Sequence, residues 1–193
     1  MLNFGLQIKG TKSEGNFKNI LSPFDNRIVG KIEIPTISQQ EIAIQNAQNS
    51  YENIMKNMPS WKRAEILYKV SEFIKRDKEL LAQTIAAEGG KPLKDARIEV
   101  TRAANTVKMS GDEALQLNGE QITMDRAAGS ENHLAFTIKQ GLGIVYVISA
   151  FNHPVNLICH QLATAFAAGN SALVKPASQT PLSCLKICSY FLE

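Results

Sequence analysis

The sequence predicts an α/β fold in which helices come first and a parallel βαβ unit comes last. Apolar residues recur at helical spacing over residues 38–115, and strand-like alternation replaces that spacing after residue 119. A run of β-branched residues at 144–149 precedes a helix-forming stretch and a second short apolar strand. Because this order is typical of buried parallel sheets, we expect the start of a Rossmann-like sheet at residues 141–193.

The composition is that of a globular protein with a buried core. The 193 residues are 44% hydrophobic and 20% charged, and the net charge of +3 is spread along the chain. No run of like charge is long enough to follow a phosphate backbone, so we expect no nucleic-acid partner. No stretch reaches the roughly 18 apolar residues of a membrane span, and residues 1–10 lack the order of a signal peptide. We therefore expect no membrane partner and a cytoplasmic location.

The first 35 residues show little periodicity, apart from an alternation at 27–35 that predicts an edge strand or one arm of a hairpin. A helix should follow, because Ser38-Gln39-Gln40-Glu41 has the form of a capping box. This first helix should run to about Lys56. Its core-facing residues are predicted to be Ile44, Ala47, Tyr51, Ile54 and Met55.

Three more helices are predicted between Pro59 and Leu115. Trp61 should pack at the start of the second, whose core face comprises Ala64, Leu67, Val70, Phe73 and Ile74. Asp77 can cap the third, whose core face comprises Leu80, Leu81, Thr84 and Ile85. The Gly89-Gly90 pair ends that helix, and Pro92 opens the fourth.

Strands and one more crossover complete the prediction. Residues 121–124 and 133–139 fit a two-stranded arm, since the polar, glycine-containing stretch 127–132 separates them. After the strand at 144–149 and a turn at 150–154, a helix should run from about Val155 to Ala168. The strand 171–175 then closes a βαβ unit with the usual right-handed crossover, and Pro181 begins another helix.

The ends of the two parallel strands predict a ligand site. In open α/β sheets, ligands bind beyond the carboxyl ends of the strands, which places residues 149–152 and 175–179 on one rim. The glycine fingerprint of ordinary dinucleotide folds is absent, because Gly141-Leu142-Gly143 precedes the strand. The residues by themselves therefore indicate only a candidate nucleotide site.

The cysteines do not indicate a disulfide framework, a nucleophile or a metal site. They are three in number, and Cys184 and Cys188 lie one helical turn apart. Cys159 directly precedes His160, but sequence neighbours on a helix point in different directions, so the two are not expected to act as nucleophile and base. Metal-ligand spacings are missing. We expect reduced thiols in apolar surroundings.

Four successive motifs of the final third resemble the aldehyde dehydrogenase superfamily: Phe151-Asn152-His153-Pro154, Ala167-Ala168-Gly169-Asn170, Lys175-Pro176-Ala177 and Gln179-Thr180-Pro181-Leu182. The resemblance extends back through Glu88-Gly89-Gly90-Lys91-Pro92-Leu93 and Ser22-Pro23-Phe24-Asp25, so it covers nearly the whole chain. It implies the amino-terminal part of that fold. Residues 1–118 would be a hairpin and four helices of the cofactor-binding domain, 119–140 an oligomerisation arm, and 141–193 the start of the NAD(P)-binding sheet.

The resemblance also implies roles for residues of the rim. Asn152 is similar to the asparagine whose amide holds the oxyanion when a cysteine attacks an aldehyde. The residue alone favours a simpler role, completing a turn before Pro154, and the flanking matches reverse that order. Lys175 resembles the lysine that contacts the adenosine ribose, although a solvated strand end is the commoner fate of a lysine. The remaining cofactor-binding positions implied by the resemblance are Ile148, Ser149, Ala150, Phe151, Ser178 and Gln179.

Three positions depart from the common family pattern. Ser178 replaces a glutamate that binds the ribose hydroxyls in many NAD-preferring members, so NADP should be tolerated or preferred. Phe151 replaces a tryptophan conservatively. Gln161 replaces a lysine and, unlike it, cannot carry charge.

The resemblance implies an NAD(P)-dependent oxidation of a small-molecule aldehyde to a carboxylic acid by a homo-oligomer. In the family, the nucleophilic cysteine, the general-base glutamate and the glycine-rich helix start near the cofactor phosphates lie beyond position 193. We therefore expect this chain to be inactive alone. A noncatalytic nucleotide-binding or subunit-pairing module and a nonfunctional remnant are the alternatives.

Overall fold

The computed structural model describes residues 2–193 and begins with a small mixed sheet. Strands β1 (Leu2–Phe4), β2 (Phe17–Leu21) and β3 (Ile28–Glu33) are arranged in the order β1-β3-β2. β3 pairs antiparallel with β2, so the predicted hairpin arm at 27–35 is confirmed, but it also pairs in parallel with β1 and is therefore central, not the edge strand that was expected. The second neighbour of β3 is β1, which is formed by residues 2–4 in the part of the sequence that shows little periodicity. Ile20 and Ile32 of this sheet pack on Leu182 near the other end of the chain.

Helix α1 (Ile37–Asn53) starts earlier than predicted and buries a different face. Its capping box is formed by Thr36 and Gln39, whose backbone N–H groups each donate to the other's side chain. The buried residues include Ala43 and Ala47, whereas Ile44 is 52% exposed and the predicted packing of Ile44 and Ile54 was wrong. Small residues face inward because α1 lies close against strands β6 and β7. A short 3-10 helix, η1 (Met55–Asn57), follows.

Helices α2 (Ser60–Arg76), α3 (Lys78–Gly89) and α4 (Leu93–Ala114) lie where helices were predicted. The core face of α2 is confirmed for Leu67, Val70 and Ile74, all nearly inaccessible to solvent. Trp61, however, is 61% exposed and Leu80 also faces solvent, so packing was wrongly predicted for both. The Asp77 side chain bonds to Arg76 and Tyr190 instead of capping α3.

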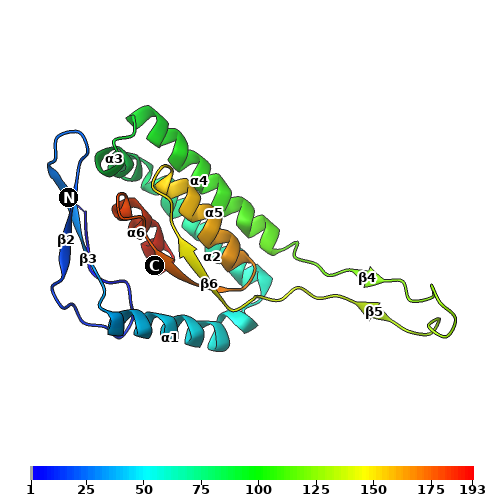
Figure 1. Cartoon of the computed structure of the whole chain (residues 1–193). Helices are drawn as coiled ribbons and strands as arrows, with labels where there is room; N and C mark the ends of the chain where they lie inside the picture. The colour runs from blue at the N-terminus through cyan, green and yellow to red at the C-terminus, as the bar shows by residue number, and fades with distance from the viewer. Residues whose placement is uncertain (1) are drawn as a thin grey trace.

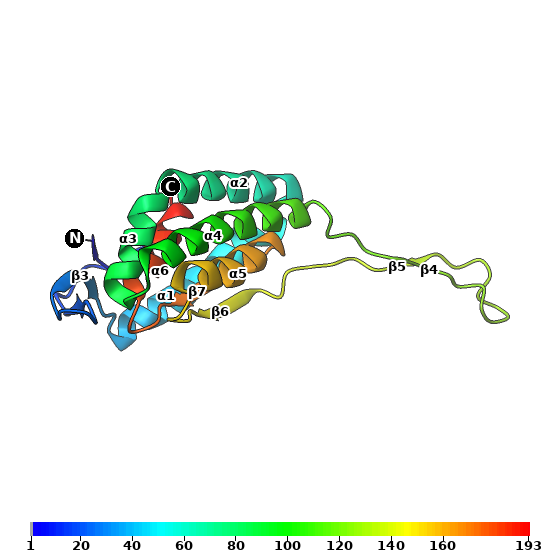
Figure 2. The same ribbon diagram turned by 90° about the horizontal axis from the view of Figure 1, so that it is seen from above.

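Two strands form an arm that extends away from the helices, as Figure 1 and Figure 2 show. β4 (Gln121–Ile122) and β5 (Ala135–Phe136) are antiparallel, with Gln121 opposite Phe136. The paired region is shorter than predicted. Large apolar side chains on this arm are exposed, among them Leu134, Phe136 and Ile138.

The βαβ unit is present as predicted. Strand β6 (Ile144–Ile148), helix α5 (Pro154–Ala167) and strand β7 (Ser171–Lys175) precede helix α6 (Pro181–Tyr190), and the two strands are parallel. Of the run expected to be buried, Val147 is buried but Tyr146 is 56% exposed. The prediction of burial on both faces was thus wrong for alternate residues, because residues 2–193 cover one face of β6 better than the other.

One core joins the helices to the βαβ unit. Buried residues of α2, α3 and α4 pack with residues of α5, α6 and β6, including Val147, Ile158 and Ile187. Figure 2 shows α2, α4 and α5 running side by side, with β6 and β7 next to α5. Among the helices of residues 2–193, none combines the length and apolar character needed to cross a membrane.

Candidate functional site

Strand register brings the two rim loops together. Ile148, the last residue of β6, is paired with Lys175, the last residue of β7. The Ser149 N–H donates to the Lys175 carbonyl at 3.0 Å, and the Thr180 hydroxyl donates to the Phe151 carbonyl at 3.5 Å. The loops that leave the two strands, residues 149–153 and 176–180, therefore share one edge of the sheet, as the sequence predicted.

Asn152 lies at the exposed turn between β6 and α5. Its carboxamide oxygen accepts a hydrogen bond from the His153 N–H at 3.1 Å. Within residues 2–193 the Asn152 amide nitrogen has no hydrogen-bond acceptor. Both of its N–H groups can therefore donate to an oxygen that carries developing negative charge, which is what an oxyanion site needs.

Glu99 of α4 caps the start of α5. Its carboxylate accepts hydrogen bonds from the Val155 and Asn156 N–H groups at 2.9 and 3.1 Å. Lys91 is paired with the same carboxylate, and His153 Nδ1 lies 3.4 Å from it. Negative charge is favourable here because the first N–H groups of a helix are unpaired and carry partial positive charge.

Glu88 of α3 caps α6 in the same way. The Leu182 and Ser183 N–H groups donate to its carboxylate at 2.8 and 2.9 Å. Burial raises the pKa of the Glu88 carboxyl to about 7, although the hydrogen bonds from Ser183 and Leu182 oppose the shift. Both helix starts at the rim are thus occupied by carboxylates of the protein, so a cofactor phosphate would have to bind elsewhere.

The other predicted rim residues differ in how they face the solvent. Lys175, Ser178 and Gln179 are exposed, and the Lys175 ammonium makes one hydrogen bond, to the Pro176 carbonyl at 3.3 Å. Ile148 and Phe151 present exposed apolar side chains. These groups fit the adenosine part of a dinucleotide, which combines an apolar ring with ribose hydroxyls.

The side-chain hydrogen bonds of Ser149 and Gln161 lie within the segment that runs from β6 to α5. Ser149 is buried, with its hydroxyl 3.4 Å from the Ala150 carbonyl, and Ala150 is half-buried. Gln161 donates from its side-chain amide to the Ile148 carbonyl at 3.1 Å, which ties α5 to the end of β6. An uncharged residue suits this contact with the backbone.

The three cysteines lie away from the rim on helices, as predicted. Cys159 and Cys184 are fully buried, and Cys188 is half-buried. Burial raises the pKa of the Cys159 thiol, and a hydrogen bond with Cys184 together with burial raises that of Cys188. Nucleophilic cysteines need the opposite shift, so these thiols suit core packing.

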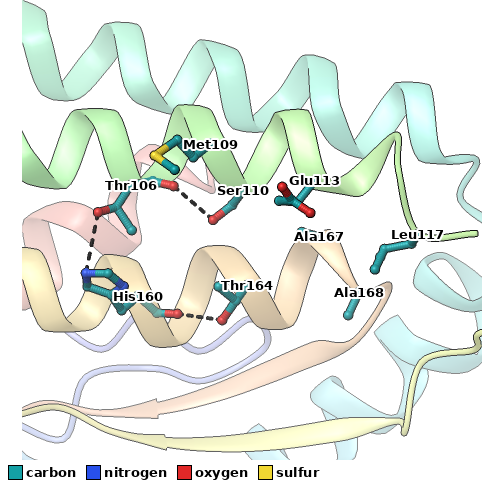
Figure 3. Close-up of a pocket in the computed structure, with 9 residues that line it drawn as sticks. All are labelled: Thr106, Met109, Ser110, Glu113, Leu117, His160, Thr164, Ala167 and Ala168. Carbon is teal, nitrogen blue, oxygen red and sulfur yellow. Dashed lines mark hydrogen bonds between the residues drawn. The ribbon is translucent and has the colours of Figure 1, made fainter.

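A groove of about 320 Å³ between α4 and α5 was not predicted (Figure 3). Thr106 lies 3.5 Å from His160 Nε2 at one end. None of the predicted rim residues lines this groove, which is bounded by Thr106, Met109, Ser110, Glu113, Leu117, His160, Thr164, Ala167 and Ala168.

Sequence reasoning missed the two buried glutamates. Each had a usable signal, because Glu88 and Glu99 lie at helical spacing on otherwise apolar faces. Glu88 follows Thr84 by one turn, and Glu99 lies between Ala96 and Ala103 on one face of α4. A carboxylate on an apolar face needs a partner, and here that partner is a helix start.

The sequence model of the aldehyde dehydrogenase family matches residues 11–193 of the chain. The chain belongs to the aldehyde dehydrogenase family. It is 34% identical over 191 residues to 3-sulfolactaldehyde dehydrogenase of Priestia aryabhattai, covering 98% of this chain and 39% of that one.

Solved aldehyde dehydrogenases have the same fold over the matched part. Aldehyde dehydrogenase 21 of Physcomitrella patens, in complex with succinate, superposes with a TM-score of 0.92 at 31% identity, covering 98% of this chain and 40% of that one. An NADP-dependent glyceraldehyde-3-phosphate dehydrogenase of Bacillus halodurans, complexed with NADP, gives 0.87 at 34% identity, covering 92% and 37%. The chain thus spans about 40% of the length of these relatives.

Proposed function

We propose that these 193 residues form the oxyanion-binding part and the adenosine-binding part of an NAD(P)-dependent aldehyde dehydrogenase, which oxidises an aldehyde to a carboxylic acid. The observation that carries the proposal is the exposed Asn152, whose amide N–H groups have no acceptor within residues 2–193. The turn that holds Asn152 is tied to Thr180 on one side and to Glu99 on the other.

Asn152 donates hydrogen bonds to the oxyanion that forms when a thiolate adds to the aldehyde carbon. A donor held in place for developing charge lowers such a barrier by about 3 kcal/mol. The attacking thiolate and the base for thioester hydrolysis come from outside these residues on this proposal. Cys159 and Cys184 are buried in the core, and the raised pKa of Cys188 disfavours its thiolate. When bound, the nicotinamide cofactor would accept the hydride that the aldehyde carbon loses on oxidation.

Four residues of the rim would hold the adenosine of the cofactor, namely Ile148, Ser149, Ala150 and Phe151, and Lys175, Ser178 and Gln179 would supply its polar contacts. The relative from Bacillus halodurans is complexed with NADP, which supports use of the phosphorylated cofactor here. Since Ser178 places no carboxylate beside the ribose, NADP should be accepted at least as readily as NAD. Kinetics that favour NAD a hundredfold, about 2.7 kcal/mol, would contradict this choice.

The proposal includes the organisation of the complete enzyme. Residues 1–118 and 141–193 belong to the cofactor-binding domain, and the arm at 119–140 pairs subunits of a cytoplasmic homo-oligomer. The exposed apolar residues of the arm support this role. They also favour the second candidate, a subunit-pairing module without catalysis.

The test combines this chain with the separately produced remaining part of a related aldehyde dehydrogenase. We expect no turnover of any aldehyde by the chain alone and measurable NADPH formation from the mixture. Asn152→Ala should lower kcat of the mixture about a hundredfold, whereas Asn105→Ala, an exposed carboxamide on α4, should leave kcat unchanged.

Two results would count against the proposal. Turnover by the chain alone that disappears on Cys159→Ser or Cys184→Ser would place the nucleophile in this chain. Stable complexes that bind NADP but never turn over would favour the noncatalytic module.

A further inference from the structure

The turn after Asn152 converges on one buried carboxylate. The Glu99 side chain is 1% exposed, and its two oxygens contact four groups from two other segments. One oxygen accepts from the Val155 and Asn156 N–H groups, while the other faces Lys91 and His153. The Lys91 ammonium also lies 2.9 Å from His153 Nδ1. Glu99 therefore holds the first turn of α5 directly and the residue that follows Asn152 through Lys91.

Helix α5 has no cap of its own. His153, at the N-cap position, makes no capping hydrogen bond with its side chain, and Pro154 has no N–H to satisfy. The Leu157 N–H already donates to the His153 carbonyl, which leaves Val155 and Asn156 as the donors that need a partner. Glu99 supplies that partner from 56 residues away in sequence.

The charge of Glu99 is balanced where it lies. Lys91 pairs with the carboxylate from the loop between α3 and α4, and the start of α5 adds partial positive charge. A buried carboxylate with such partners keeps a fixed geometry, because both of its oxygens are held by donors from other segments. Glu99 itself does not reach the exposed side of the turn where Asn152 lies.

We propose that Glu99 is a positioning residue for Asn152, an inference that rests on the proposed function of Asn152. Thr180 anchors the Phe151 carbonyl on one side of Asn152. On the other side Glu99 anchors the start of α5 directly, and it holds Lys91, which is hydrogen-bonded to His153 Nδ1 at 2.9 Å. With Glu99 in place, the Asn152 amide points in one direction before substrate arrives. Without it, the turn samples several arrangements and the oxyanion loses its donor for part of the time.

The alternative is that Glu99 only stabilises the contact between α4 and α5. Two variants separate these roles. Glu99→Gln keeps the size of the side chain but removes the charge and one acceptor oxygen. Val100→Ala removes buried apolar volume from the next residue of α4, so it destabilises the fold and leaves the cap intact.

The first measurement uses the isotopically labelled full chain and needs no activity. In Glu99→Gln, amide hydrogen exchange at Val155 and Asn156 should accelerate about tenfold more than in Val100→Ala, because an uncharged Oε1 accepts their two hydrogen bonds more weakly than a carboxylate does and the new Nε2 donor would face the Lys91 ammonium. The side-chain amide resonances of Asn152 should shift or broaden in Glu99→Gln and stay in place in Val100→Ala. If Glu99→Gln does not fold, the same exchange measurement is made on two other variants. Lys91→Met removes the cation that pairs with Glu99, and Glu99→Asp tests whether a shorter carboxylate still protects the Val155 and Asn156 N–H groups.

The second measurement uses the mixture of this chain with the remaining part of a related enzyme. Glu99→Gln should lower kcat about tenfold, while the KM for the aldehyde and the KM for NADP each change less than twofold. Glu99→Asp should recover part of the lost kcat. Equal effects of Glu99→Gln and Val100→Ala on exchange, on the Asn152 resonances or on kcat would overturn the positioning role. If the unsubstituted mixture is inactive, the proposed function fails, and the exchange and resonance data still decide whether Glu99 positions Asn152.

Discussion

Glu88 and Glu99 are buried carboxylates in similar places with different partners. Glu99 pairs with Lys91, whereas Glu88 receives its hydrogen bonds from the start of α6, at Leu182 and Ser183. Burial without a cation explains why the pKa of Glu88 is raised to about 7. The free energy of unfolding should therefore depend on pH in a range where few carboxyls titrate.

The sign of that dependence follows from the two pKa values of Glu88, 4.5 when solvated and about 7 in the fold. Between them the folded chain binds more protons than the unfolded chain, so stability falls as pH rises from about 4.5 to 7 and is level above. The loss is at most about 3 kcal/mol. Glu88→Gln should remove it.

Urea unfolding of both proteins at several pH values between 5 and 8 measures this difference. Asp77 and Glu79, whose pKa values are lowered to about 2, contribute only at lower pH. Glu113→Gln, an exposed change on α4, serves as the control and should keep the pH slope of the unsubstituted chain. Identical slopes in all three proteins would show that Glu88 does not titrate in this range.

Gly90 adopts the left-handed backbone conformation at the end of α3, where the sequence predicted that Gly89-Gly90 would end the helix. It ends α3 with a φ of +68°, and a Cβ at this position would lie 2.9 Å from Pro23 Cγ. Gly90→Ala should lower the free energy of unfolding by about 1–2 kcal/mol, since a non-glycine residue is strained in this conformation. Gly89→Ala is the matched control within the helix, with a Cβ 3.2 Å from Thr180, and should cost less. Thermal melting of the two variants compares them.

At the scale of elements, helices α1 and α2 show where periodicity predicts packing and where it does not. In α2 the apolar face is also the buried face, and Leu67 is inaccessible to solvent. In α1 the apolar face and the buried face differ, because alanines at 43 and 47 permit close approach to the strands. Ile44 would be buried only if another element packed on the side of α1 that faces away from the strands.

Two truncations quantify this contrast. Leu67→Ala should destabilise the chain by about 2–5 kcal/mol, because it opens a cavity in a packed core. Ile44→Ala, at a position 52% exposed, should change stability by less than about 0.5 kcal/mol. Denaturant unfolding provides both values, and equal losses would place Ile44 in a packed environment.

At the scale of the whole molecule, the exposed apolar residues of the arm should drive association. Leu134 and Ile138 are 79% and 66% exposed, in a two-stranded element too short to bury them (Figure 2). Light scattering after size exclusion at about 100 μM should give a mass above the 21.2 kDa monomer. Replacing Leu134 and Ile138 with Asn should lower that mass, while Lys139→Gln should not. A monodisperse monomer of the unsubstituted chain would argue against association.

The sequence by itself determined the elements whose causes are local. Helical spacing predicted α2 to α4, with Gly89-Gly90 marking the end of α3. The β-branched run and the helix that follows it predicted the βαβ unit. The pairing of β6 with β7 then placed the two rim loops together, as expected for parallel strands. The motif around Asn152 pointed to the same rim.

Only the tertiary structure decided which residues meet across long separations. β3 is a central strand because residues 2–4 pair with its free side. Ile44 is exposed because α1 packs against the strands through its alanines. Glu88 and Glu99 cap helix starts 94 and 56 residues away, so the sequence could indicate that each is buried but not which helix start it caps. Local propensity depends on neighbours in sequence, whereas the pairing of a buried charge or strand depends on what folding brings beside it.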